Sequence, residues 1–83
     1  MNIGERLRKK RKEKHLTLEQ IGSFIGVSKQ TVQRYESGQI ENIPLSRLSE
    51  LAKVLGTTPG YLMGWESEDI DNYDSIKNLL GIN

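Results

Sequence analysis

The chain has 83 residues, 35% of them apolar, which is enough for one small domain with a modest core but not for a deep enzyme cleft. The absence of cysteine excludes disulfides and thiolate chemistry and fits a reducing cytoplasm. No apolar run approaches the length of a membrane-spanning helix, and the N-terminus lacks the apolar segment of a signal peptide, so we expect a cytoplasmic protein without a membrane partner.

The net charge of +1 hides an uneven distribution of charge along the chain. Residues 1–65 contain eleven Lys or Arg and six Asp or Glu, a balance of +5, whereas residues 66–83 contain one and five, a balance of −4. A basic surface attracts a phosphate backbone, and an acidic segment is repelled by it. We therefore expect residues 1–65 to form the domain and residues 66–83 to form an acidic linker or tail that faces a different partner.

A first helix is predicted over residues 3–14. Asn2 is a suitable N-cap for it, with Glu5 at the third helical position. Five consecutive basic residues, 8–12, lie inside this helix. The run is either a solvated helix face or a surface in direct contact with phosphates, and the sequence leaves both interpretations open.

Residues 17–38, TLEQIGSFIGVSKQTVQRYESG, predict two short helices separated by a three-residue turn. Thr17 and Gln20 suit a capping box at the start of the first helix, and Gly26 ends that helix with a permissive backbone. Ser28 is a suitable cap for the second helix, which a glycine closes at residue 38.

The two helices have distinct inner and outer faces. Helical spacing places Ile21, Phe24 and Ile25 on one inward stripe of the first helix. Val32 and Tyr35 face inward from the second helix. The outer face of the second helix then carries the polar residues Lys29, Gln30, Gln33 and Arg34.

A loop and two further helices are predicted after this pair. Residues 39–43 lack helical periodicity and precede Pro44, so they form the loop. The core face of the fourth helix consists of Leu48, Leu51, Ala52 and Leu55, and a glycine follows it. Thr58 followed by Pro59 suits the start of a short fifth helix.

The C-terminal segment is acidic and poor in apolar residues up to Asp74, which suits a linker. Asp74 is also a suitable cap for a short helix over residues 75–80. The acidic stretch from Asp69 is not an EF-hand loop, because Asp74 stands where glycine is needed and Leu80 where a glutamate is needed.

The glycine, apolar and capping positions of residues 17–38 together resemble the helix-turn-helix of the lambda-repressor-like transcription regulators of phages and bacteria. The flanks IGERLRKKRKEKHLT and IPLSRLSELAKVLGTTPGYLMGW are similar to the other helices of that domain, so the resemblance covers roughly residues 3–65. It implies a compact, all-α, five-helix domain with the helix-turn-helix at its second and third helices. The implied function is a phage-type repressor that binds a pseudo-palindromic double-stranded DNA operator as a homodimer.

The resemblance implies that the second helix of the pair enters the major groove, where base edges present distinct patterns of donors and acceptors. Gln30 suits adenine, whereas Lys29 and Arg34 suit the acceptors of guanine, with Thr31 or Gln33 assisting. The residues expected to bind phosphates lie near the helix ends: Ser28, Ser37, Gln39 and Asn42. The alternative for the polar residues is an ordinary solvated helix face.

The family resemblance also implies a structural ion pair between Arg11 and Glu36, which would tie the first helix to the third. Three positions depart from the family pattern. Leu18 stands where many members have a glutamine that bonds a phosphate, and Lys10 stands where an apolar residue is common, so its stem is expected to cover the core. His15 stands where glycine often closes the first helix, and we expect a cap residue there rather than a catalytic or metal-binding one.

No enzyme activity, metal or cofactor is expected, because one histidine and no cysteine leave no common zinc site and no His-based triad. Tyr61 and Trp65 suggest a stacking platform for single strands, but after a core helix such residues more often anchor a domain end or a subunit contact. The candidates for the dimer contact are Ile40, Ile43, Leu62 and Trp65, with completion of the core as an equal alternative.

A competing function is a protein-interaction module on the same fold, such as an antitoxin or an adaptor that responds to an antirepressor. Its partner would bind residues 66–83. In similar repressors such a segment joins the DNA-binding domain to an oligomerisation or self-cleaving peptidase domain, so the chain is either a fragment of a longer repressor or a short regulator. The resemblance places the protein in the cytoplasm of a bacterium or a phage-infected cell.

Overall fold

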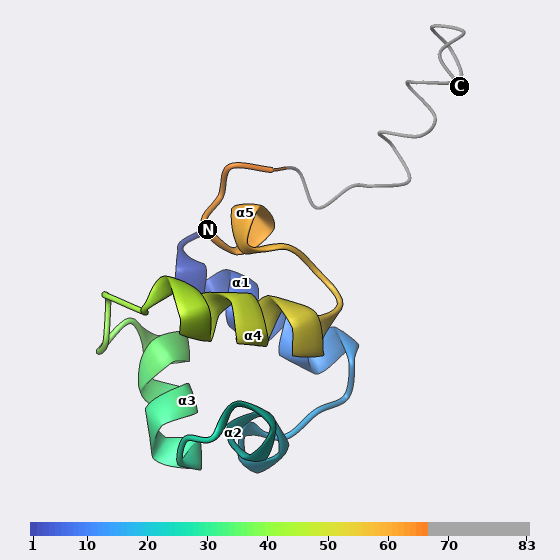
Figure 1. Cartoon of the computed structure of the whole chain (residues 1–83), viewed down its shortest axis with the longest axis vertical. Helices are drawn as coiled ribbons and strands as arrows, with labels where there is room; N and C mark the ends of the chain where they lie inside the picture. The colour runs from blue at the N-terminus through green and yellow to red at the C-terminus, as the bar shows by residue number, and fades with distance from the viewer. Residues whose placement is uncertain (67–83) are drawn as a thin grey trace, which may run out of the picture.

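The computed structural model describes residues 1–66, which contain helices and no strand (Figure 1). The helices are α1 (Ile3–Glu13), α2 (Leu18–Ile25), α3 (Lys29–Ser37), α4 (Leu45–Leu55) and α5 (Pro59–Leu62). The predicted all-α, five-helix fold is therefore confirmed. The predicted acidic tail, apart from its first residue, and the predicted helix over residues 75–80 lie outside the described residues.

Local capping interactions set the helix ends where the sequence predicts them. The side chain of Asn2 accepts a hydrogen bond of 2.9 Å from the N–H of Glu5 at the start of α1. Thr17 and Gln20 form the reciprocal capping box of α2, with distances of 3.0 and 2.8 Å between each side chain and the other's backbone nitrogen. His15, just after α1, has a φ of 56°, the left-handed conformation that ends many helices, as its predicted cap role requires.

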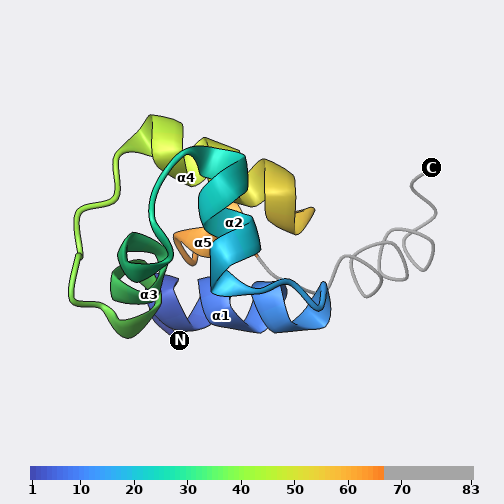
Figure 2. The same ribbon diagram turned by 90° about the horizontal axis from the view of Figure 1, so that it is seen from below.

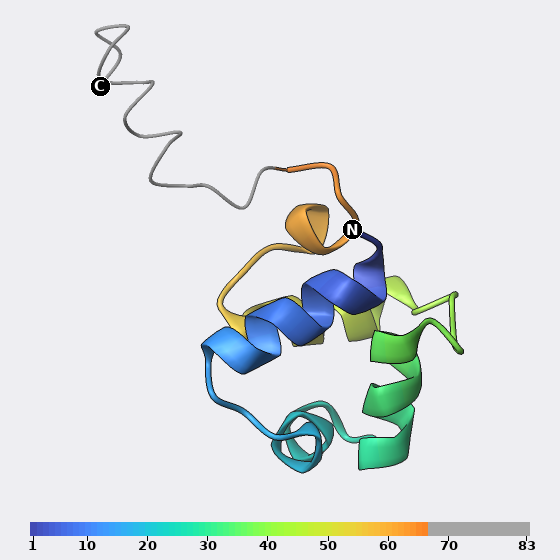
Figure 3. The same ribbon diagram turned by 180° about the vertical axis from the view of Figure 1, so that it is seen from behind.

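The helices are arranged around a central pair. α1 and α4 contact each other, with α2 and α3 on one side of the pair and α5 on the other (Figures 1 and 3). In the view from below, α2 lies in front of the α1 and α4 pair and runs across it from one helix toward the other (Figure 2). α3 packs against both α1 and α2, so two helices fix its orientation.

Every helix contributes to one apolar core. Its members are Leu7, Ile21, Ile25, Val32, Tyr35, Leu48, Leu51, Ala52, Leu55, Tyr61 and Leu62. Burial of these side chains is the main stabilising term for a domain of this size. The inward faces predicted for the third and fourth helices are confirmed by this list.

The inward position predicted for Phe24 is wrong, because 67% of this residue is exposed. The buried face of α2 is formed instead by Ile21, Gly22 and Ile25. A β-carbon on Gly22 would lie 2.5 Å from the carbonyl oxygen of Val27, so this glycine is pressed against the turn. Glycine does not count as an apolar residue in the helical pattern, so the pattern does not show that Gly22 is buried. The predicted inward face is therefore shifted toward Phe24.

A charged pair joins α1 to α3, as the family resemblance implied. Arg11 Nε lies 2.6 Å from Glu36 Oε2, and Arg11 Nη2 lies 3.1 Å from Glu36 Oε1. Arg11 Nη1 donates a third hydrogen bond, of 2.9 Å, to the carbonyl oxygen of Leu16. The two side chains are only 15% and 9% exposed, so this bidentate pair is largely removed from water.

Lys10, which departs from the family pattern, reaches toward the ring of Tyr61, a member of the core. Its ammonium group lies 5.0 Å from the centre of the Tyr61 ring and 3.4 Å from a carboxylate oxygen of Glu13. Arg6 approaches the same ring at 6.0 Å. Two cations therefore contact one buried aromatic ring between α1 and α5.

Candidate nucleic-acid interface

The turn between α2 and α3 occupies Gly26, Val27 and Ser28, the three residues that the sequence predicts. Gly26 adopts a φ of 76°, and the N–H of Val27 donates a hydrogen bond of 2.9 Å to the carbonyl oxygen of Gly22. Ser28 Oγ then accepts a hydrogen bond of 3.2 Å from the N–H of Thr31 and caps α3. The two helices are thus joined by a short connection in which the N–H groups of Gly26 and Val27 both bond the carbonyl oxygen of Gly22.

The two faces of α3 differ in burial. Val32 and Tyr35 are 2% and 7% exposed and face the core. The outer side chains predicted to contact bases are all exposed: Lys29, Gln30, Gln33 and Arg34. Thr31 is half-buried, and its hydroxyl lies 3.1 Å from Ser28 Oγ, so it belongs partly to the cap. The structure brings the predicted base-contacting residues together on one helix face.

The residues predicted to bind phosphates lie near both ends of α3. Ser28 precedes its first residue, whereas Gln39 and Asn42 are exposed in the loop that follows it. Ser37 Oγ donates a hydrogen bond of 3.3 Å to the carbonyl oxygen of Arg34 and accepts one of 3.4 Å from the N–H of Gln39. Ser28 therefore lies at one end of the outer face of α3, and the other three residues lie at the opposite end. The helix between the two ends is about 13 Å long.

A hollow lies between α1, α2 and α3 beside this face. It is lined by Arg8, Arg11, Leu18, Gln33, Glu36 and Ser37. From sequence alone Arg8 is one member of a run of five cations, so its place beside α3 was not predicted. The signal that points to it is its three-residue spacing from Arg11, which puts both on one side of α1.

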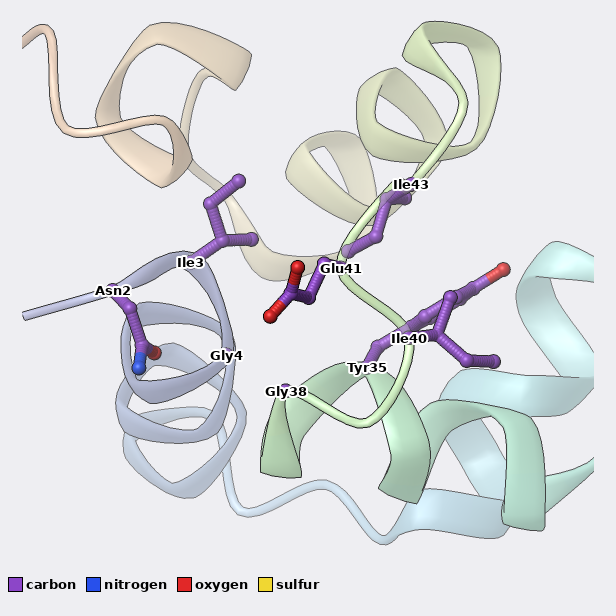
Figure 4. A pocket seen from close by; sticks show the side chains of 8 residues that line it. All are labelled: Asn2, Ile3, Gly4, Tyr35, Gly38, Ile40, Glu41 and Ile43. Atoms are coloured by element: carbon purple, nitrogen blue, oxygen red, sulfur yellow. The ribbon is translucent and has the colours of Figure 1, made fainter.

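A second hollow, of about 240 Å³, lies between the start of α1 and the loop after α3 (Figure 4). Ile40 and Ile43, two of the predicted dimer-contact residues, line it and are half-buried. The third candidate, Leu62, is wrong as a surface contact, because it is 0% exposed and completes the core. The fourth, Trp65, is 78% exposed after α5, whereas Tyr61 is buried and is excluded as a stacking platform.

Two kinds of feature are absent from residues 1–66. No helix there is long and apolar enough to cross a membrane. No group of three or more His, Cys, Asp or Glu side chains there is arranged to hold a metal ion.

Comparison with known proteins identifies relatives of this arrangement. The helix-turn-helix family matches residues 7–62. An uncharacterized helix-turn-helix transcriptional regulator, y4wC of Sinorhizobium fredii, is 33% identical over 72% of this chain and 41% of its own length. The prophage-derived uncharacterized regulator YonR of Bacillus subtilis is 33% identical over 92% of this chain and 68% of its own length. The chain thus spans about two fifths of the first relative and two thirds of the second.

Solved structures share the fold. The P22 c2 repressor in complex with a synthetic operator matches with a TM-score of 0.73 at 29% identity, over 80% of this chain and 98% of that one. The biofilm regulator SinR in complex with DNA matches with a TM-score of 0.68 at 28% identity, over 72% and 95%. Hydroxypropylphosphonic acid epoxidase from S. wedmorenis matches at 0.69 and 30% identity over 74% of this chain but only 32% of that enzyme. The chain therefore belongs to the lambda-repressor-like helix-turn-helix family of transcription regulators.

Proposed function

We propose that the protein is a sequence-specific transcription regulator of the repressor type, which blocks a promoter by binding double-stranded DNA. The observation that carries this proposal is the division of α3 between a buried inner face and an exposed outer face of hydrogen-bonding side chains. A helix held rigidly in this way fits the major groove, where its outer side chains meet base edges.

The outer face of α3 offers groups that suit particular bases. The amide of Gln30 can make two hydrogen bonds to adenine, and Lys29 and Arg34 suit the O6 and N7 acceptors of guanine. Arg34 has no ion pair with any residue of the range 1–66, so its guanidinium is available to a ligand. Gln33 is exposed beside these residues and assists, whereas the hydroxyl of Thr31 is partly occupied by the cap.

Phosphate contacts at both ends of α3 would hold this face against the groove. Ser28, Ser37, Gln39 and Asn42 are all exposed and polar, and Ser37 is the last residue of α3. Such contacts set the position of a protein on the duplex but carry little sequence information. We therefore assign sequence preference to the outer face of α3 and positioning on the duplex to the polar residues that flank this face.

A phage-type repressor acting as a homodimer is the finer form of this proposal. One domain of this size reads few base pairs, so two copies on half-sites about 34 Å apart would supply the needed affinity and specificity. Ile40, Ile43 and Trp65 are the remaining candidates for the subunit contact. The prophage origin of one relative and the operator bound to the P22 c2 repressor support this form.

Selection of duplexes from a random pool tests the proposal directly. We expect an enriched inverted repeat whose two halves are about one helical turn apart. Recovery of a single half-site would support sequence reading without a dimer. Failure of any sequence to be enriched, with the protein folded, would refute sequence-specific binding.

The competing function, a protein-interaction module, is favoured by the exposure of Trp65 next to the acidic segment 66–83. Removal of residues 66–83 separates the two functions. A regulator that acts through DNA keeps its affinity for the selected duplex, since an acidic segment is repelled by phosphates. An adaptor instead loses its protein partner while its α3 face stays intact.

A further inference from the structure

We propose that the hollow between α1, α2 and α3 is a phosphate site, in which Arg8 binds a phosphate of the DNA backbone beside the bases that α3 reads. This inference rests on the proposed DNA-binding function. It adds to that function a contact from α1, which lies outside the helix-turn-helix.

The position of the hollow places its ligand at the edge of the DNA-facing surface. Gln33 and Ser37, one turn apart on α3, line the hollow and also belong to the side of α3 that carries the proposed DNA contacts. Arg8 reaches the hollow from α1, and the side chain of Leu18 forms an apolar wall without a hydrogen-bond donor. A group bound there is therefore held between the recognition helix and α1.

The charges around the hollow leave one cation free to bind an anion. The lining contains two arginines and one glutamate, but Arg11 and Glu36 are bonded to each other at 2.6 and 3.1 Å. Arg8 is exposed, and its side chain makes no hydrogen bond or ion pair with residues 1–66. Its guanidinium presents donors in a planar fork that matches two oxygens of a phosphate.

The rest of the basic run in α1 is placed differently. Lys10 contacts Glu13 and the ring of Tyr61. Lys9 is already engaged in an interaction of its own, and Lys12 is exposed but does not line the hollow. The two interpretations of the run therefore apply to different residues, with Arg8 as the one that meets a phosphate.

The first experiment compares Arg8→Gln with Lys53→Gln, which removes the same charge from an exposed position on α4. Binding of the selected duplex and of a scrambled duplex is measured over a range of salt concentrations. We expect Arg8→Gln to weaken both duplexes by a similar factor, roughly tenfold for each half-site, as for one charged hydrogen bond. The slope of log affinity against log salt should fall in magnitude by about 0.9 for each phosphate that the variant no longer neutralises.

The controls define what the charge itself contributes. Arg8→Lys keeps the charge and is expected to keep the salt slope, whereas Lys53→Gln should leave affinity and slope near those of the wild type. Equal effects of Arg8→Gln and Lys53→Gln would overturn the proposal. Thermal unfolding by circular dichroism should show no loss of fold in these variants, because both side chains are exposed.

The second experiment locates the phosphate. Single backbone linkages of the selected duplex are replaced by neutral methylphosphonates, and the loss of affinity is measured for the wild type and for Arg8→Gln. Neutralising one particular linkage in each half-site should lower the affinity of the wild type. The same replacement should cause a much smaller loss of affinity in Arg8→Gln. Identical losses in both proteins at every linkage would refute the contact.

The outcomes also separate this inference from the function on which it rests. Sequence preference in the wild type together with an unchanged salt slope in Arg8→Gln would refute the phosphate site and keep the regulator function. Equal binding of all duplexes by the wild type would refute sequence reading, while a reduced slope in Arg8→Gln would still support the phosphate site.

Discussion

Glu36→Ala removes the carboxylate that joins α3 to α1, and we expect it to lower the free energy of unfolding by about 3 kcal/mol. The substitution breaks two hydrogen bonds from Arg11, of 2.6 and 3.1 Å, and the side chains involved are only 15% and 9% exposed. Loss of one partner leaves the other charge desolvated, which typically costs about 3–5 kcal/mol. The lower value applies because Arg11 keeps its hydrogen bond of 2.9 Å to the carbonyl oxygen of Leu16.

Urea unfolding followed by circular dichroism measures this loss. A small domain has only about 5–15 kcal/mol of stability, so the midpoint should shift strongly, and Tm should fall by more than about 10 °C. Glu50→Ala is the matched control, because its partner Arg47 Nη1 lies 3.5 Å away and the two side chains are 33% and 51% exposed. Solvent screening limits the expected cost of that control to about 0.5 kcal/mol.

Equal losses in Glu36→Ala and Glu50→Ala would refute the reasoning, because the α1 to α3 pair would then act as an ordinary surface pair. A double variant, Arg11→Met with Glu36→Leu, removes both charges and leaves no unpaired group. We expect it to be more stable than Glu36→Ala alone. A double variant as unstable as Glu36→Ala would mean that packing volume, rather than the unpaired charge, causes the loss.

Three further predictions concern the DNA-facing helix and the core. Arg34→Ala should weaken binding of the selected duplex by about 1–3 kcal/mol and affect a scrambled duplex less, and equal losses in titrations of the two would mean that Arg34 touches only phosphate. Ile21→Ala should cost about 2–5 kcal/mol in urea unfolding, whereas Phe24→Ser should change stability by no more than about 0.5 kcal/mol, contrary to the apolar pattern. Gly4→Ala should destabilise by about 1–3 kcal/mol, because its β-carbon would collide with backbone carbonyl groups at the end of α3; a Tm equal to that of the wild type would contradict this close approach.

Much of this fold follows from interactions between residues close in sequence. Asn2, Thr17 and Ser28 each cap a helix by bonding an N–H three residues away, so the partner is visible in the sequence itself. Gly26 and Gly38 adopt left-handed conformations that glycine permits without strain. For these reasons the helix boundaries and the helix-turn-helix were predictable, and the outer face of α3 was predicted with them.

Only the tertiary structure decided which side chains the core accepts and which surfaces meet. Phe24 and Leu62 are both large and apolar, yet one is 67% exposed and the other 0%, because burial depends on where neighbouring helices cross. Gly22 has no side chain to mark the buried face of α2, although it lies against the turn. Arg8 and Gln33 are far apart in sequence and line one hollow only because α1 packs across α3. Periodicity specifies the face of one helix at a time, whereas the contact between two helices depends on their packing.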